Sequence, residues 1–214
     1  MDFVAADIKS LKADHLTCVR NELELFRELS FELHPGQLIQ IEGANGCGKT
    51  SLIRILCGLA RPAEGAVLWC DNQIEHSRGE YYADMLYIGH NNGLKSNLTC
   101  EENLEVSAIQ DHFKQGYDIE QALEQMGLDD LIDEYAGKLS AGQQRRVALS
   151  RLLLSDAPLW ILDEPFTALD HASRERMEGI FDEHCQSGGM VILTTHHHMS
   201  IPNTEVKVLK VDAA

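Results

Sequence analysis

Short apolar runs, bounded by polar and glycine-containing segments, repeat along the chain. The runs Pro158–Leu162 and Met190–Leu193 have the length and the β-branched content of buried strands. Leu25–Leu33 alternates between apolar and polar positions as a half-buried strand does, and Pro35-Gly36 after it predicts a turn. We expect further strands at Gln37–Glu42, Ala66–Cys70, Met85–Ile88, Pro158–Asp163, Met190–Thr194 and Val206–Val211. We expect helices at Lys49–Gly58, Gly142–Leu154 and Ala172–Cys185.

The segment Asn97–Gly137 has a different, mainly helical pattern. Thr99 stands where it can cap a helix, and Glu102 three residues later is typical of a capping box. Asp118–Gly127 predicts a second short helix that ends in a glycine. Elsewhere strands alternate with helices, which indicates an α/β sheet covered on both faces. We therefore expect a single domain, residues 1–214, with a core of 1–96 and 156–214 and a helical subdomain inserted at about 97–155.

The bulk composition is that of an ordinary globular protein. The chain has 214 residues, enough for one domain, of which 44% are hydrophobic and 24% charged. No stretch reaches the ~20 apolar residues that cross a bilayer, and Met1–Asp7 lacks the basic flank and apolar run of a secretion signal. We therefore expect a chain that stays in the cytoplasm without direct membrane insertion.

Charge and cysteine usage narrow the expected partners. The formal charge of −16 argues against nucleic acid or anionic lipid as a ligand, because both require a basic face. Any contact with a membrane would then be made through another protein. The six cysteines are scattered, with neither a C-x-x-C pair nor zinc-site spacing, which predicts free thiols in a reducing compartment.

The segment Gly43–Thr50 is a complete G-x-x-x-x-G-K-[ST] phosphate loop. Its glycines let the backbone wrap a polyphosphate with the N–H groups turned inward, and the following helix N-terminus adds a favourable dipole. Lys49 is placed to contact the β- and γ-phosphates, and the Thr50 hydroxyl to bind Mg²⁺. The predicted nucleotide-binding residues here are Gly43, Ala44, Asn45, Gly46, Cys47, Gly48, Lys49, Thr50 and Ser51.

A second chemical motif follows the apolar run Leu159–Leu162, which ends in the carboxylate pair Asp163-Glu164. Ligands bind at the carboxyl edge of parallel sheets, so this pair is expected at the nucleotide. Asp163 would hold Mg²⁺ through water, and Glu164 would act as the general base that orients and polarises the attacking water. A lone Asp-Glu pair is usually only a turn at a strand end, but the phosphate loop upstream favours the hydrolytic interpretation.

Leu139–Gln143 reads L-S-A-G-Q, and with the phosphate loop it makes nearly the whole chain resemble the ATP-binding-cassette (ABC) ATPases. The resemblance implies ATP and Mg²⁺ as ligands and a P-loop NTPase fold of the ABC ATPase type. That fold is α/β, with an inserted helical subdomain and an antiparallel β portion at the N-terminus. It also implies a homodimer formed as a head-to-tail ATP sandwich. In that dimer Ser140, Gly142 and Gln143 contact the γ-phosphate of the ATP held by the partner subunit.

Two further segments carry the same resemblance. Ala168-Leu169-Asp170 matches the loop of the family that crosses the dimer interface, called the D-loop. His196, directly after the predicted strand Met190–Thr194, falls at the switch histidine that senses the γ-phosphate. The resemblance therefore implies Glu164, His196 and Lys49 as the catalytic residues.

The chain departs from the family pattern at two positions. The residue in register with the Q-loop glutamine is His90, which can bond the same water or phosphate oxygen but titrates near neutral pH. We therefore assign His90 to the nucleotide site, with a contact to the metal as a further hypothesis. The adenine-stacking aromatic is replaced by Arg20, which either stacks on the base through its guanidinium or is a solvated surface charge.

Within the family, the chain most resembles the ATP-binding subunits of cytochrome c maturation (haem exporter) systems. The supporting features are alanine at the third position of Leu139–Gln143, the run Trp160–Ala168, and His90 followed by Gly93-Leu94-Lys95. The resemblance implies a peripheral subunit on the cytoplasmic side of the inner membrane, paired with membrane subunits of the CcmB, CcmC and CcmD types. ATP hydrolysis would drive haem export or release of a haem-loaded chaperone.

Three alternatives share the same motifs. One is a cassette ATPase without a membrane partner, such as the iron–sulfur assembly type, and another is the ATPase subunit of a different small-molecule transporter. The third is a nucleotide-gated scaffold that barely turns ATP over, which the presence of Lys49, Asp163, Glu164 and His196 disfavours. Co-purification with membrane subunits separates the first alternative, and a steady-state turnover assay separates the third.

Overall fold

The computed structural model describes residues 9–111, 113–197, 199 and 201–211, so the first eight and last three residues of the predicted domain lie outside the described residues. The strands are β1 (Leu11–Arg20), β2 (Leu23–Leu33), β3 (Gln37–Glu42), β4 (Glu64–Trp69), β5 (Asn72–Gln73), β6 (Met85–Ile88), β7 (Leu159–Asp163), β8 (Met190–Thr194) and β9 (Glu205–Lys210). The helices are α1 (Lys49–Leu56), α2 (Arg78–Ala83), α3 (Cys100–Asp111), α4 (Ile119–Gln125), α5 (Ala141–Leu154) and α6 (His171–Gln186).

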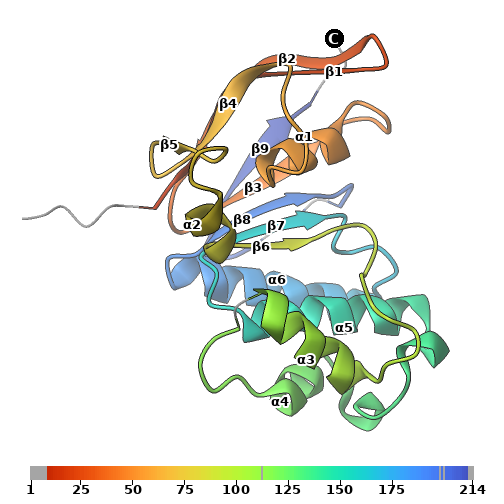
Figure 1. Ribbon diagram of the computed structural model, residues 1–214. Coiled ribbons are helices and arrows are strands. Elements are labelled where there is room, and N and C mark those ends of the chain that lie inside the picture. The colour runs from red at the N-terminus through yellow and green to blue at the C-terminus, as the bar shows by residue number, and fades with distance from the viewer. Residues whose placement is uncertain (1–8, 112, 198, 200, 212–214) are drawn as a thin grey trace, which may run out of the picture.

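These elements form two sheets with helices between and below them (Figure 1). The antiparallel sheet has the order β2-β1-β4-β5, and the parallel sheet has the order β6-β7-β8-β3-β9. Helix α1 lies between the two sheets, whereas α5 and α6 cover the opposite face of the parallel sheet (Figure 1). The predicted α/β class and the antiparallel portion near the N-terminus are therefore confirmed.

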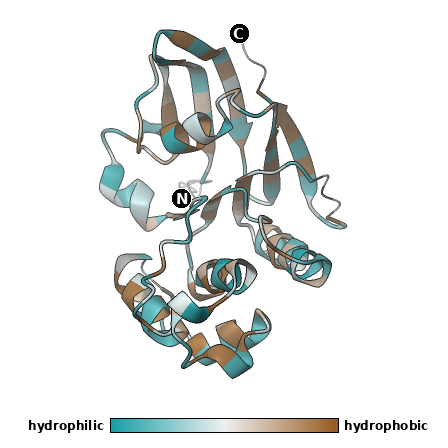
Figure 2. Cartoon of the chain, turned by 90° about the vertical axis from the view of Figure 1, so that its right-hand side faces the viewer, coloured by the Kyte–Doolittle hydropathy of each residue, from teal (hydrophilic) through white to brown (hydrophobic). Residues whose placement is uncertain are grey.

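The apolar core is divided by the parallel sheet into two clusters. Leu159 and Ile161 of β7 point into the cluster shared with α1 and the antiparallel sheet. Trp160 and Leu162 of the same strand point into the cluster shared with the helices below. Figure 2 shows that hydrophobic residues make up much of the strands, whereas the helices carry both hydrophobic and hydrophilic residues. Both faces of β7 are thus buried, as its uninterrupted apolar run predicts.

The predicted elements are present, with ends displaced by a few residues. Helix α1 stops at Leu56, two residues before Gly58, and β4 starts at Glu64 rather than Ala66. The predicted capping box forms: the Glu102 N–H donates to Thr99 Oγ1 at 3.1 Å, and the Thr99 N–H donates to Glu102 Oε2 at 2.9 Å. These reciprocal bonds satisfy donors that the first turn of α3 would otherwise leave unpaired.

Strands β1 and β5 and helix α2 were not predicted. β1 joins β2 through the two residues Asn21-Glu22, which have φ of 50° and 65°. Two successive left-handed residues make the tight turn whose twist matches a hairpin. Asn21 is typical of such a turn, but Glu22 stands where glycine is usual, so the sequence did not predict the hairpin.

Candidate active site

The phosphate loop connects β3 to α1, as predicted. A Cβ on Gly43 would lie 2.4 Å from the Val211 carbonyl oxygen, so the backbone here passes too close to the end of β9 for any side chain. Gly48 has a φ of 108° at the N-cap of α1, a conformation that L side chains rarely adopt. The loop therefore leads directly into the N-terminus of α1, where the helix dipole favours an anion.

Lys49 is buried, with 8% of its surface exposed. Its Nζ donates to the carbonyl oxygens of Gly43 at 2.8 Å and of Ala44 at 3.2 Å. In this structure the loop carbonyls thus bind the ammonium group of Lys49. A polyphosphate would exchange these neutral acceptors for charged ones, which bind an ammonium about twice as strongly.

A cavity of about 370 Å³ opens beside this loop. It brings together the loop and helix residues with Glu164 of the acidic pair and with Arg20, the residue in the adenine-stacking register. Its lining residues are Arg20, Leu25, Asn45, Gly46, Gly48, Lys49, Thr50, Ser51 and Glu164. Arg20 therefore lies where a base could stack, and none of the residues that line this cavity is aromatic.

The acidic pair stands at the carboxyl end of β7. Asp163 is 2% exposed, and its Oδ1 accepts a hydrogen bond from Thr194 Oγ1 of the neighbouring strand β8 at 2.8 Å. The same Thr194 oxygen accepts from the Glu164 backbone N–H at 2.8 Å. Glu164 itself has a φ of 51°, an uncommon conformation for a non-glycine residue. One buried hydroxyl therefore fixes both members of the pair.

His196 follows β8 and faces the carboxylate of Glu164. Its Nε2 lies 3.5 Å from Glu164 Oε1, and the two side chains are 53% and 23% exposed. The structure thus brings together the two residues that the resemblance paired. Both keep access to solvent, which a base that must meet an attacking water requires.

Ser140, Gly142 and Gln143 start helix α5. Ser140 Oγ accepts from the Gln143 N–H at 3.3 Å, while Gln143 Oε1 accepts from the Ser140 N–H at 2.8 Å, which forms a capping box. A Cβ on Gly142 would lie 2.6 Å from the Ala168 carbonyl oxygen, so the helix start abuts the D-loop. None of these three residues lines the phosphate-loop cavity of the same chain.

The D-loop ends in Asp170, which is the N-cap of α6. Asp170 Oδ1 accepts from the Ser173 N–H at 2.8 Å. The hydrogen bonds from Ser173 lower the pKa of Asp170, which stays ionised beside the positive end of the helix dipole. Ala168, with a φ of 64°, makes the sharp bend before it.

His90 does not line the cavity beside the phosphate loop. It lines a separate cavity of about 400 Å³ between the exit of β6 and the start of α5. The other residues of that cavity are Asn91, Asn92, Gly93, Leu94, Ser96, Ala136 and Gln144. A contact between His90 and the nucleotide or its metal therefore stays a prediction.

Sequence reasoning missed Arg145 of α5. Its guanidinium is 3% exposed and donates to the backbone carbonyls of Asp163 and Glu164, both at 3.0 Å. The basic cluster at the start of this helix was visible in the sequence, but nothing in its spacing distinguishes the buried arginine from Arg146 beside it.

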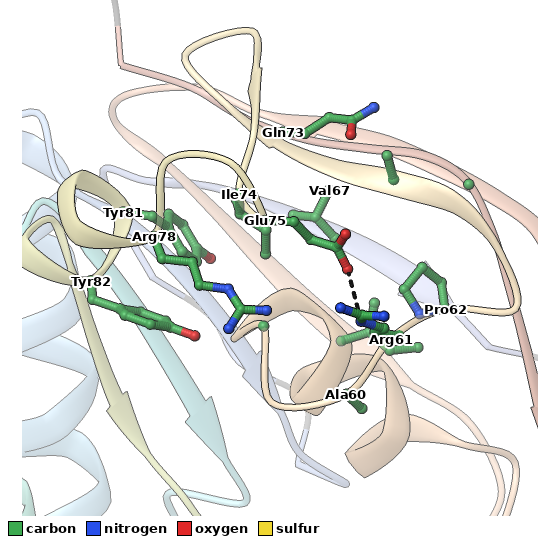
Figure 3. A pocket seen from close by; sticks show the side chains of 14 residues that line it. Ala60, Arg61, Pro62, Val67, Gln73, Ile74, Glu75, Arg78, Tyr81 and Tyr82 are labelled. Carbon is green, nitrogen blue, oxygen red and sulfur yellow. Dashed lines mark ion pairs between the residues drawn. The ribbon is translucent and has the colours of Figure 1, made fainter.

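A third cavity, of about 280 Å³, lies between α1, β4, β5 and α2 (Figure 3). Arg61 and Glu75 face each other across it, with Nε 3.4 Å from Oε1. None of the predicted site residues lines this cavity. Among the described residues, no helix is long and apolar enough to cross a membrane.

The fold and the site together define a nucleotide hydrolase of the phosphate-loop class. Residues 26–167 match the ABC transporter family. The chain is 48% identical over 203 residues to the cytochrome c biogenesis ATP-binding export protein CcmA of Mannheimia succiniciproducens, a match that covers 94% of both chains. The corresponding protein of Haemophilus influenzae is 47% identical over 207 residues, or 95% of each chain.

Solved structures give the same fold. An ATP-binding subunit of an ABC transporter has a TM-score of 0.76 at 24% identity and matches 87% of this chain and 79% of its own. A dimeric ATP-binding cassette in a post-hydrolysis state, bound to ADP and phosphate, has a TM-score of 0.78 at 22% identity and matches 95% and 96%. The chain therefore belongs to the ABC transporter family, within its CcmA-type ATP-binding proteins, and it is a nucleotide-binding ATPase.

Proposed function

We propose that this ATPase works as a head-to-tail homodimer in cytochrome c biogenesis. Its hydrolysis cycle drives haem export or the release of a haem-loaded chaperone. Membrane subunits of the CcmB, CcmC and CcmD types hold it at the cytoplasmic side of the inner membrane. The observation that carries the biological role is the similarity over 94% of the chain to a protein named as a cytochrome c biogenesis export protein.

The division of the site within one chain supports the dimer. Lys49 and Glu164 line the phosphate-loop cavity, whereas Ser140 lies at another helix start outside it. A helix N-terminus is suited to an anion, and a second subunit can supply one. Two chains arranged head to tail would complete two sites at once, because such an interface is symmetric.

Within each site the residues divide the work of hydrolysis. Lys49 and the loop amides hold the β- and γ-phosphates and stabilise the charge that develops on them. Glu164 accepts a proton from the attacking water, and His196, 3.5 Å from its carboxylate, orients that carboxylate and senses the γ-phosphate. Thr194 holds the backbone of Glu164 so that the carboxylate keeps its place.

The donor set also suits Mg²⁺, which prefers oxygen ligands and retains several waters. The Thr50 hydroxyl is exposed in the phosphate-loop cavity, and the Asp163 carboxylate is held at the adjoining sheet edge by Thr194. Thr50 would bind the ion directly and Asp163 through water. When bound, the ion neutralises charge on the β- and γ-phosphates.

The substitution Glu164→Gln tests the hydrolytic roles and the dimer together. It keeps the size and a hydrogen-bonding side chain but removes the base, so turnover should fall at least ~100-fold while ATP binding persists. Light scattering with Mg-ATP should then report a dimer, and without nucleotide a monomer. Near-wild-type turnover would remove Glu164 from the role of base, and a monomer at saturating Mg-ATP would contradict the sandwich. Lys49→Ala is the control that should lose ATP binding.

The biological role is tested in a host strain that lacks its own cytochrome c biogenesis ATPase. Wild-type protein should restore haem-stained c-type cytochromes, and Glu164→Gln should not restore them at equal protein levels. Co-purification should recover membrane subunits with both variants. If cytochrome c staining is not restored by an active, membrane-associated wild-type ATPase, another transport role replaces the proposed one.

A further inference from the structure

Arg145 uses every hydrogen-bond donor of its guanidinium. Nε donates to the Pro165 carbonyl at 3.1 Å, and Nη2 donates to the carbonyls of Asp163 and Glu164, both at 3.0 Å. Nη1 donates to the Gly89 carbonyl at 2.8 Å and to Asn92 Oδ1 at 3.2 Å. A guanidinium has five N–H donors in a planar fork, so the set is complete.

All five of these acceptors are uncharged, which is unusual for a cation that is 3% exposed. Burial lowers the pKa of Arg145 to about 10, and the nearby carboxylates of Asp163 and Glu164 oppose that shift, so the side chain remains charged near neutral pH. A buried charge is tolerated only where hydrogen bonds replace its lost hydration. The buried charge of Arg145 is thus stabilised by the geometry of five hydrogen bonds rather than by one ion pair.

The acceptors come from the two segments that leave the carboxyl ends of adjacent parallel strands. Asp163, Glu164 and Pro165 follow β7, while Gly89 and Asn92 follow β6. The donor belongs to α5, five residues after Ser140 in the same helix. Three parts of the molecule that are distant in sequence therefore meet at one side chain.

We propose that Arg145 is a positioning residue for ATP hydrolysis, which holds the backbone around Glu164 at a fixed place relative to the start of α5. Glu164 is kept in its left-handed conformation from both sides, by Thr194 at its N–H and by Arg145 at its carbonyl. When Ser140 at the start of α5 contacts a nucleotide, any shift of the helix is transmitted through Arg145 to the backbone of Glu164. This inference rests on the proposed role of Glu164.

A bidentate fork cannot be replaced by a point charge, which gives the first test. Arg145→Lys keeps the charge but has three N–H donors instead of five and lacks the planar fork, so the Glu164 carboxylate should shift. A misplacement of about 1 Å can cost about 100-fold in rate, so we expect kcat to fall about 10- to 100-fold. The KM for ATP should change less than about 3-fold, since Lys49 and the loop amides are untouched.

The matched control is Arg151→Lys, which changes another arginine of α5 that forms an ion pair with Asp111 at 2.7 Å. It should leave kcat within about 2-fold, because its partner lies away from the nucleotide. A kcat loss of equal size in both variants would mean that Arg145 only stabilises the helix, and this result would contradict the proposal. Wild-type kcat in Arg145→Lys would overturn the proposal outright.

A double substitution separates this proposal from the role of Glu164. If Arg145 acts through Glu164, then Arg145→Lys should cause no further loss of single-turnover rate in the Glu164→Gln background. Additive losses would overturn the proposal. Full activity of Glu164→Gln alone would instead overturn the role of Glu164 itself.

Asn92→Ala decides the question if Arg145→Lys fails to fold. Asn92 is half-buried and outside the apolar core, so the substitution removes one acceptor of the fork without opening the core. It should lower kcat about 3-fold with an unchanged KM, which is the effect of losing one hydrogen bond of about 0.6 kcal/mol. An unchanged kcat in this variant would contradict the proposal that the hydrogen bonds of Arg145 position Glu164.

Discussion

Thr194→Val removes one buried oxygen and should affect both stability and turnover. Thr194 is 0% exposed, and its hydroxyl serves Asp163 Oδ1 and the Glu164 N–H at 2.8 Å each. Valine has nearly the same shape, so the substitution opens no cavity. It leaves a buried carboxylate without this donor and an amide without its acceptor.

The magnitude follows from those two bonds. A hydrogen bond to a charged group contributes about 1.5–3 kcal/mol, and an amide left without its acceptor costs about 1–3 kcal/mol. Allowing for access of water to the sheet edge, we expect the free energy of unfolding to fall by about 3 kcal/mol. Thr194→Ser keeps both bonds and loses one methyl group, so it should cost only about 1 kcal/mol.

Urea unfolding at about pH 7.5, where aspartate is ionised, measures this difference. With an m value of about 2.5 kcal/mol per molar urea, the midpoint should fall by about 1.2 M for valine and about 0.4 M for serine. The kcat for ATP should fall with valine and recover with serine. Equal midpoints for the two variants would refute the reasoning, because the hydroxyl would then contribute nothing.

Two further predictions concern packing and pH. Gly142→Ala should lower kcat, because its Cβ would lie 2.6 Å from the Ala168 carbonyl and displace the start of α5, whereas Gly179→Ala on open helix surface should stabilise the fold by about 0.5–1 kcal/mol. His184 stacks on Trp160 with ring centroids 3.5 Å apart, and burial lowers its pKa to about 4. The unfolded chain accepts that proton near pH ~6.5, so stability is complete above this pH and decreases by about 3 kcal/mol as the pH falls toward 4. His184→Phe should flatten that slope in urea titrations at several pH values, and an unchanged slope would assign it to other groups.

The sequence predicted the parts of the site that depend on local pattern. The phosphate loop, the acidic pair and the Thr99 capping box each occupy a few consecutive residues whose types follow from backbone geometry. Strands β7 and β8 are mainly apolar because both of their faces are buried. They could therefore be predicted without knowing which strands they pair with. Strand β1 was not predicted, because its bulged register against β2 breaks the alternation of apolar and polar residues that marks a strand.

The interactions that join distant segments could not be predicted. Thr194 serves the acidic pair only because β8 lies beside β7, and Arg145 meets the segments after β6 and β7 only because α5 crosses beneath them. Hydrogen bonds of this kind depend on three-dimensional placement, which neither the charge of a residue nor its spacing encodes. The contact between His90 and the nucleotide stays a prediction from its register in the sequence, and within this chain His90 lines a cavity beside the start of α5.

The order of the parallel sheet also constrains when the enzyme can first act. Strand β3, which leads into the phosphate loop, pairs with β8 and β9, and β8 separates it from β7. A nascent chain therefore carries the loop sequence long before either neighbouring strand of β3 has left the ribosome. Pairings between segments this far apart form late, because closing long loops is entropically costly. ATP hydrolysis should thus be withheld until β8 and β9 have been synthesised, and chains released before these strands should be unable to consume ATP.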